Sequence, residues 1–167
     1  FPPVSTGPAP EAMTMNWWLM KSEPDVFGIE HLKAEGSTLW DGIRNYQARN
    51  YMRTMAIGDR AFFYHSNITP PGIIGLMEVV EVGLIDPSQF DPQSKYFDPA
   101  SKRESPRWDC VRLTYLATFA PLLSLDRLRE EFTPDELAVV RRGNRLSILP
   151  VPEACATRLY EMLGPAS

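Results

Sequence analysis

The sequence has little of the chemistry on which most enzymes depend, with two cysteines and two histidines in 167 residues. Cys110 and Cys155 lie far apart, without the close spacing of zinc ligands, so we expect free thiols and no metal site. No apolar run reaches the ~20 residues that a membrane helix needs. No basic-then-apolar leader precedes the first strand, so the sequence predicts neither a membrane span nor secretion.

Motifs for nucleotide binding and for hydrolysis are missing as well. No Walker sequence is present, no G-x-G-x-x-G follows a strand, and no G-x-S-x-G elbow occurs. His65 and Ser66 are neighbours at the end of an expected strand, where adjacent side chains point to opposite faces. A Ser–His dyad is therefore disfavoured, and we expect no cofactor.

The chain is acidic, with a formal net charge of −4 at pH 7. Proteins that bind polyanions without selectivity are usually strongly basic, so this class is disfavoured. The arginines nevertheless gather in three groups, within residues 44–60, 103–107 and 141–145. If these groups converge, one face is positive, and the alternative is an ordinary mixed surface.

The order of expected elements predicts one domain of class α+β. Residues 1–15 are rich in Pro, Ala, Ser and Gly and predict an irregular arm, whereas residues 16–164 form the domain. Residues 84–107 predict a long irregular segment, and segments of that kind are usually functional or disordered. Because helices do not regularly separate the strands, we expect a mixed or antiparallel barrel of five or six strands with peripheral helices. The expected strands are 16–22, 61–66, 73–82, 108–119 and 146–149, and the expected helices follow Pro24 or cover 46–55, 125–132, 135–142 and 152–164.

The stretch from Trp40 to Asn50 concentrates an aromatic ring, a carboxylate, guanidiniums and amides. Gly42 permits a tight bend, and Asn45 is a good N-cap for a helix that starts at Tyr46. A helix N-terminus flanked by Arg44 and Arg49 is a candidate anion site. The alternative is that Trp40 packs in the core and the arginines pair with nearby acids.

Two tryptophans stand at the ends of expected elements, where a rigid scaffold presents side chains to ligands. Trp40 precedes a bend, and Trp108 opens a strand. If their indoles face each other, they hold a flat ring such as an unpaired base. Core packing is the alternative for each of them. Glu23 and Asp41 also follow strand ends, where either acid–base chemistry or pairing with arginine is open.

Seven stretches of the sequence together carry a resemblance to a known family: Trp18–Pro24, Trp40–Asn50, Phe62–Asn67, Pro70–Gly75, Gln89–Pro92, Pro106–Trp108 and Arg141–Ser147. In these stretches the chain resembles the EVE domain family. The resemblance implies a PUA-like barrel related to YTH and ASCH domains, whose members bind nucleic acids. It also implies that Lys21 and Ser22 close the first strand, with Trp40 and Trp108 as residues of an aromatic cage.

These observations favour a protein that binds a modified nucleobase in DNA or RNA without catalysis, with methylcytosine as one candidate. Trp40 and Trp108 are expected to sandwich the base. The groups expected to complete the base site are Ser22, Asn45, Tyr46, His65 and Ser66, and those expected to contact phosphates are Arg44, Arg49, Arg107 and Arg142.

Two alternatives remain. An ASCH-like enzyme acting on RNA or a modified nucleoside would use Lys21, Glu23, Asp41 and His65 for acid–base chemistry. A sensor would bind a free nucleobase or nucleotide in the same pocket. We expect a monomer that is cytoplasmic in a bacterium, or nuclear if the source is eukaryotic.

Overall fold

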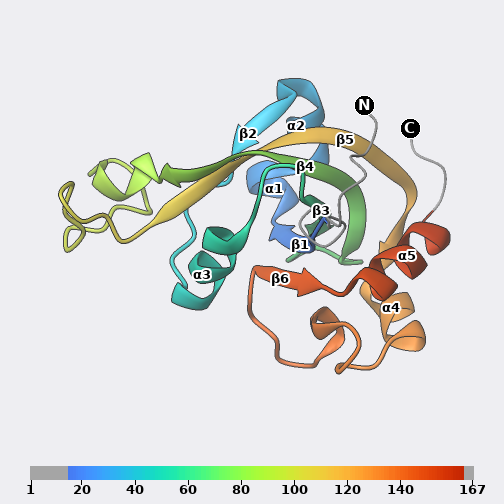
Figure 1. The fold of residues 1–167 in the computed structure, drawn as a ribbon. Coiled ribbons are helices and arrows are strands. Elements are labelled where there is room, and N and C mark those ends of the chain that lie inside the picture. Colours follow the sequence, from blue (N-terminus) through green and yellow to red (C-terminus); the bar gives the residue numbers. More distant parts are fainter. Residues whose placement is uncertain (1–14, 164–167) are drawn as a thin grey trace, which may run out of the picture.

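A six-stranded mixed sheet forms the centre of the computed structural model, which describes residues 15–163 (Figure 1). The strand order is β2-β5-β4-β3-β1-β6, with β1 parallel to β3 and every other neighbouring pair antiparallel. The predicted α+β class and strand number are therefore confirmed. In the described part of the chain β2 and β6 are not paired, so the sheet is curved but open rather than a closed barrel. The strands are β1 (Trp17–Ser22), β2 (Ser37–Leu39), β3 (Arg60–His65), β4 (Gly72–Ile85), β5 (Asp109–Ser124) and β6 (Ile148–Val151).

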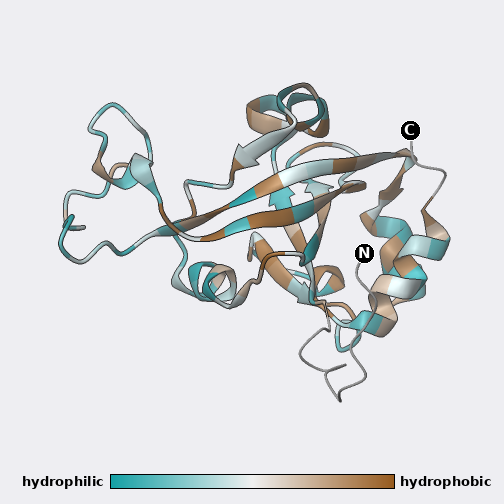
Figure 2. Ribbon diagram, turned by 45° about the horizontal axis from the view of Figure 1, so that its top comes forward, coloured by the Kyte–Doolittle hydropathy of each residue, from teal (hydrophilic) through white to brown (hydrophobic). Residues whose placement is uncertain are grey.

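The β4 and β5 strands form a long hairpin that extends away from the body of the domain (Figure 1). Their pairing contains several register shifts, which bend and twist an antiparallel ladder. The segment 86–108 connects them at the outer end and contains one short 3₁₀-helix, η1 (Pro87–Phe90). The prediction of a long irregular segment is thus confirmed, and Figure 2 shows this end of the molecule as largely hydrophilic.

The helices surround the sheet, and α3 (Tyr46–Thr54) begins where the sequence predicted. The Oδ1 atom of Asn45 accepts the backbone N–H of Ala48 at 2.9 Å, which caps the first turn of α3. Asn45 is therefore a structural cap. The α-helices are α1 (Pro24–Phe27), α2 (Ile29–Glu35), α3 (Tyr46–Thr54), α4 (Leu125–Glu131) and α5 (Glu153–Met162).

The helix expected at 135–142 is wrong. Only a 3₁₀ turn forms there, η2 (Ala138–Val140). Leu137, Val139 and Val140 are all buried. A surface helix buries a single apolar face, and these three positions would not all lie on one such face. The two β-branched valines also disfavour an α-helix. Gly164, the expected end of the last helix, and residues 1–14 of the arm expected at 1–15 lie outside the described residues.

Two apolar clusters pack on the two sides of the sheet. One contains Leu19, Phe62 and Leu159, and the other contains Met20, Trp40 and Phe63. Alternate residues of β1 and β3 thus point into different clusters, as the period of a strand requires. Both cysteines are free and buried. Among the described residues, no helix has the length and apolar character to cross a membrane.

Candidate nucleic-acid site

A cavity of about 740 Å³ lies where the end of β1, the turn after β2 and the 86–108 segment meet. Its volume is in the range of pockets that bind small ligands, roughly 300–1,000 Å³. Of the residues expected at the site, Trp40, Ser22 and Ser66 line it together. The other lining residues include Lys21, Glu23, Val26, Phe27, Thr38, Leu39, Asp41, Gly42, Ile43, Lys95, Tyr96, Asn144, Arg145 and Ser147.

The Trp40 side chain is anchored in the core and borders the cavity. It follows β2 directly, and its backbone N–H donates to the carbonyl of Val111 at 2.8 Å. Its indole is only 7% exposed and meets the ring of Phe63 edge-on, with 5.5 Å between centroids. Trp40 is therefore a core residue, as the alternative expected, and it also lines the cavity.

Trp108 has different surroundings, and it is not among the residues that line this cavity. Its indole is 5% exposed and stacks on Tyr46 with 4.7 Å between ring centroids. The indole N–H donates to Oδ2 of Asp98 at 2.7 Å. Because α3 and its own loop cover the ring, the geometry differs from the expected sandwich of Trp40 and Trp108.

Tyr96 is the aromatic residue that the 86–108 segment contributes to the cavity. A side chain on Gly42 would collide with it, since a Cβ atom there would lie 2.7 Å from the Tyr96 ring. Gly42 also has φ +79°, which glycine adopts without strain. The sequence signalled a functional loop here, but it gave no signal for which of the loop's side chains turns inward.

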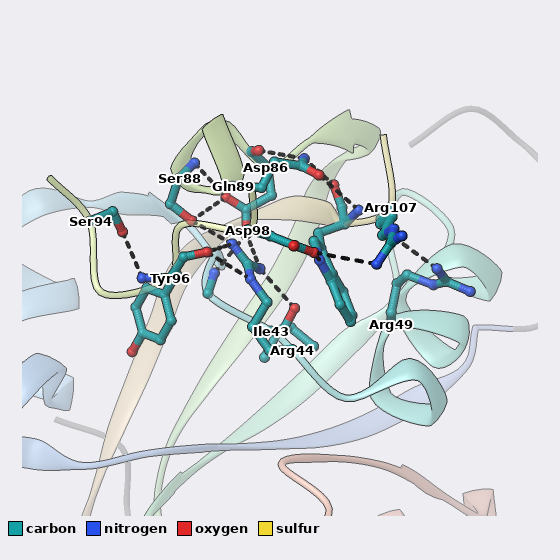
Figure 3. Close-up of polar contacts among 12 residues, drawn as sticks. Ile43, Arg44, Arg49, Asp86, Ser88, Gln89, Ser94, Tyr96, Asp98 and Arg107 are labelled. Atoms are coloured by element: carbon teal, nitrogen blue, oxygen red, sulfur yellow. Dashed lines mark hydrogen bonds and ion pairs between the residues drawn. The ribbon is translucent and has the colours of Figure 1, made fainter. Parts of the chain in front are cut away.

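Arg44 has every N–H group occupied by the protein itself (Figure 3). It donates to the carbonyls of Tyr96 and Ile43, to the carboxylate of Asp86 and to the hydroxyl of Ser88. A guanidinium has five N–H groups, so none remains for a phosphate. The expected phosphate contact at Arg44 is therefore replaced by an internal structural role.

None of the other three expected phosphate contacts lines the cavity, and two of them, Arg49 and Arg107, lie beside Trp108. Arg49 donates to the carbonyl of Arg107 at 2.8 Å and covers the ring of Tyr46 at 4.6 Å. Arg107 lies 3.9 Å from a carboxylate oxygen of Asp98. Arg142 is exposed in the segment between η2 and β6, three positions before the lining residue Arg145. These residues stay candidates for contacts that flank the cavity.

His65 has a backbone partner. Its Nε2 atom accepts the N–H of Ile29 at 3.1 Å, at the start of α2, and His65 is not among the cavity-lining residues. Burial lowers the pKa of His65, which keeps the ring neutral and able to accept this bond. The imidazole therefore joins α2 to β3, and the residue beside it, Ser66, is the one that borders the cavity.

Two ionisable groups on the cavity have shifted pKa values. Burial lowers the pKa of Lys21, because desolvation disfavours the ammonium form. Burial, with the negative charge of Asp86 as the second cause, raises the pKa of Asp41. Each shift is in the direction of the uncharged form of the group.

Comparison with known proteins places this geometry in a family. A model of the EVE domain matches residues 16–162. This chain belongs to the EVE domain family. Thymocyte nuclear protein 1 of Danio rerio is 42% identical over 153 residues, which cover 80% of this chain and 66% of that protein. The human protein is 40% identical over 154 residues, which cover 81% of this chain and 68% of that protein. This EVE chain thus spans only part of the length of these relatives.

Several solved structures have a similar fold. An X-ray structure of a Pseudomonas syringae protein matches with a TM-score of 0.84 and 40% identity, covering 87% of this chain and 98% of that one. The human THYN1 protein in complex with DNA that contains 5-methylcytosine matches with a TM-score of 0.83 and 37% identity, covering 88% and 96%. A YTH domain from Zygosaccharomyces rouxii, 12% identical with a TM-score of 0.53, shares the fold alone. The predicted relation to the EVE family is confirmed.

Proposed function

We propose that this EVE domain binds DNA carrying a modified pyrimidine of the 5-methylcytosine class and receives the modified base in the cavity beside Trp40. It binds the base without changing it. One observation carries the proposal: Trp40 and Tyr96 line the same cavity, in a chain 37% identical to a human protein crystallised with DNA containing 5-methylcytosine.

The cavity has the chemistry that a base requires. Aromatic rings offer a stacking surface worth about 1–3 kcal/mol per base. The hydroxyl of Ser66 lines the cavity and can bond the polar edge of a base, and the Oγ atom of Ser22, which donates to the carbonyl of Phe27, can still accept a hydrogen bond. Apolar side chains such as Ile43 can receive a methyl group, and burying one methyl group contributes about 0.8 kcal/mol, or roughly fourfold in affinity. We therefore expect a preference for the methylated base of about fourfold or more.

A base inside a duplex must leave the stack to enter such a cavity. Unpairing and unstacking cost a few kcal/mol, and the cost falls for a mismatched base. If the base is everted, a mismatch opposite 5-methylcytosine will tighten binding. If the protein reads the base in the groove of an intact duplex, the mismatch will not tighten it.

The test is an equilibrium titration of three matched labelled duplexes, followed by fluorescence anisotropy at constant salt. One duplex carries cytosine, one carries 5-methylcytosine, and one carries 5-methylcytosine opposite a mismatch. We expect affinity to rise in that order. Equal affinities for the cytosine and 5-methylcytosine duplexes would refute the proposed function.

The phosphates are assigned to cations on the rim of the cavity. Lys95 and Arg145 both line it and are both exposed, one from the 86–108 segment and one from the loop before β6. Since the loops flank the cavity, their cations can contact the strand on either side of an everted nucleotide. Arg49, Arg107 and Arg142 are assigned to phosphates farther along the DNA.

Replacing Lys95 or Arg145 by alanine is expected to make binding less sensitive to salt. Each phosphate contact contributes about 0.9 to the slope of log K against log salt on B-form DNA, so each variant should lower the slope by about one. The ratio of affinities for methylated and unmethylated DNA should stay the same. Titrations at three salt concentrations measure both quantities.

Arg127→Ala on α4, whose partner is Glu131, is the control and should leave the slope unchanged. An unchanged slope in the Lys95 and Arg145 variants would refute these contacts.

A second candidate function is hydrolysis of a modified nucleoside, because Lys21, Glu23 and Asp41 line the same cavity. The lowered pKa of Lys21 and the raised pKa of Asp41 are shifts of the kind that acid–base catalysis uses. Mass spectrometry of nucleosides after prolonged incubation with modified DNA or RNA separates the two functions. A new nucleoside that is lost in Glu23→Gln would favour the enzyme, and an unchanged substrate favours the binding protein. Full competition by a free nucleoside would instead favour a small-molecule sensor.

A further inference from the structure

The loop that carries Tyr96 has little regular structure to hold it. Within it, the N–H of Tyr96 donates to the Oγ atom of Ser94 at 3.0 Å, and the N–H of Ser94 donates to the carbonyl of Asp91 at 3.0 Å. Both contacts are local, so they shape the turn without fixing its place against the body of the domain. Two residues further on, Asp98 donates its N–H to the carbonyl of Gln89 and accepts the indole N–H of Trp108, so the loop is held at that end. The position of Tyr96 itself against the body of the domain depends on contacts from outside the loop.

Arg44 supplies such a contact from the turn after β2. Its Nε and Nη2 atoms donate to the carbonyl of Tyr96 at 3.0 and 2.7 Å (Figure 3). Two parallel N–H groups on one oxygen match the planar fork of a guanidinium, which a lysine ammonium cannot reproduce. The guanidinium also lies 5.2 Å from the centroid of the Trp108 ring.

A buried carboxylate orients the guanidinium. Asp86 is fully buried, and its Oδ2 atom accepts Nη1 of Arg44 at 3.0 Å and the N–H of Gly42 at 2.8 Å. Its Oδ1 atom accepts the N–H and the hydroxyl of Ser88 at 2.7 and 2.6 Å. Arg44 thus connects the 40–44 turn, the start of the 86–108 segment and the Tyr96 loop.

The turn that carries Arg44 also contacts the ring of Tyr96, through Gly42. The absent side chain of Gly42 leaves room for the ring, which a Cβ atom would meet at 2.7 Å. Asp86 holds the N–H of Gly42 while Arg44 holds the carbonyl of Tyr96. The backbone of Tyr96 and the surface beneath its ring are therefore fixed by one hydrogen-bonded unit.

From this geometry we infer that Arg44 is a positioning residue that sets the selectivity for the modified base by holding Tyr96 as a wall of the cavity. The inference rests on the proposed function for the identity of the ligand. Arg44 itself donates all its N–H groups to the protein, so its effect on the ligand must pass through Tyr96. Losing Arg44 will reduce the discrimination between methylated and unmethylated DNA more than it reduces binding to DNA as such.

A double-mutant cycle tests this coupling. Arg44→Lys and Tyr96→Ala should each remove most of the preference for the 5-methylcytosine duplex, while binding of the unmethylated duplex changes less than about twofold. Because Arg44 acts through Tyr96, the double variant should lose no more preference than the Tyr96 variant alone. The inference would be overturned if the losses of preference in the two single variants multiplied in the double variant. It would also be overturned if each variant lost the same affinity for the methylated and the unmethylated duplex.

Hydrogen exchange of the free protein gives a readout that needs no DNA. Amides of residues 91–98 should exchange faster in Arg44→Lys than in the parent, and unchanged exchange there would overturn the inference. Arg49→Lys is the matched control, because Arg49 also donates to a carbonyl of the 86–108 segment, that of Arg107, but does not bond Tyr96. If Arg44→Lys does not fold, Ser88→Ala removes one partner of Arg44 and should produce a smaller loss of preference in the same direction.

The two proposals fail in different ways. If the parent protein binds methylated and unmethylated duplexes equally, the proposed function is refuted, and hydrogen exchange alone decides whether Arg44 positions the Tyr96 loop. If the parent discriminates and Arg44→Lys discriminates equally well, the proposed function stands and the role of Arg44 is refuted.

Discussion

Binding of the 5-methylcytosine duplex is expected to weaken about 5- to 150-fold when Trp40 is replaced by alanine, which corresponds to the 1–3 kcal/mol of one base–aromatic stack. Trp40 reaches the cavity from a backbone that is hydrogen-bonded to β5 and from an indole packed on Phe63. No movement of a neighbour can restore a ring of that size at the same place. Anisotropy titration of parent and variant measures the effect.

A control is needed because Trp40 is also a core residue, and its removal lowers the free energy of unfolding as well. Trp17→Ala removes another indole of the sheet, one that borders a separate hollow beside β6. Both variants are to be assayed below their melting temperatures, as established by circular dichroism. A Trp40→Ala protein that is folded and binds methylated DNA as well as the parent would contradict the account.

Asp86→Ala should lower the free energy of unfolding by about 3–5 kcal/mol, the usual cost of breaking a buried ion pair by removing one partner. The carboxylate is fully buried and accepts four hydrogen bonds, from Gly42, Arg44 and Ser88. Its loss leaves the Arg44 side chain, which is only 22% exposed, without its ion-pair partner. Urea unfolding followed by circular dichroism measures the change.

A matched variant on the same segment separates this effect from general damage to the loop. Asp91 is exposed, and its carboxylate accepts only a local N–H, that of Gln93. Asp91→Ala should therefore change the free energy of unfolding by about 0.5–1 kcal/mol at most. Similar losses in the Asp86 and Asp91 variants would show that the buried network does not anchor the segment.

The fold was largely predictable because its signals are local. The apolar strands β1, β3, β4 and β5 stand out by pattern, and the caps at Asn45 and Ser124 mark the starts of α3 and α4. The residue types around η2 predict an α-helix, but only a 3₁₀ turn forms there. The two valines of this turn are buried against other parts of the domain, and sequence periodicity does not reveal such tertiary packing. The sequence predicts a closed barrel, but the edge strands β2 and β6 do not pair in the described residues. Whether two edge strands pair depends on contacts between distant parts of the chain, which local patterns do not report.

The site was predictable only in part, because several of its contacts join residues that are far apart in the sequence. The place of Trp40 at the end of an element and the family resemblance of Ser22 both predict the site, and both residues line the cavity. The sequence predicts a phosphate contact at Arg44 because its distant partners, Asp86 and Tyr96, cannot be recognised from spacing. The same limit hid Tyr96, whose inward orientation depends on that arginine and on Gly42.

The most direct test is a crystal structure of this domain with a duplex that contains one 5-methylcytosine. The account predicts that the modified base leaves the helix and lies in the cavity beside Trp40, with Tyr96 as a second wall and Lys95 and Arg145 near the flanking phosphates. A modified base still stacked in the duplex, or one bound elsewhere on the domain with this cavity empty, would contradict it.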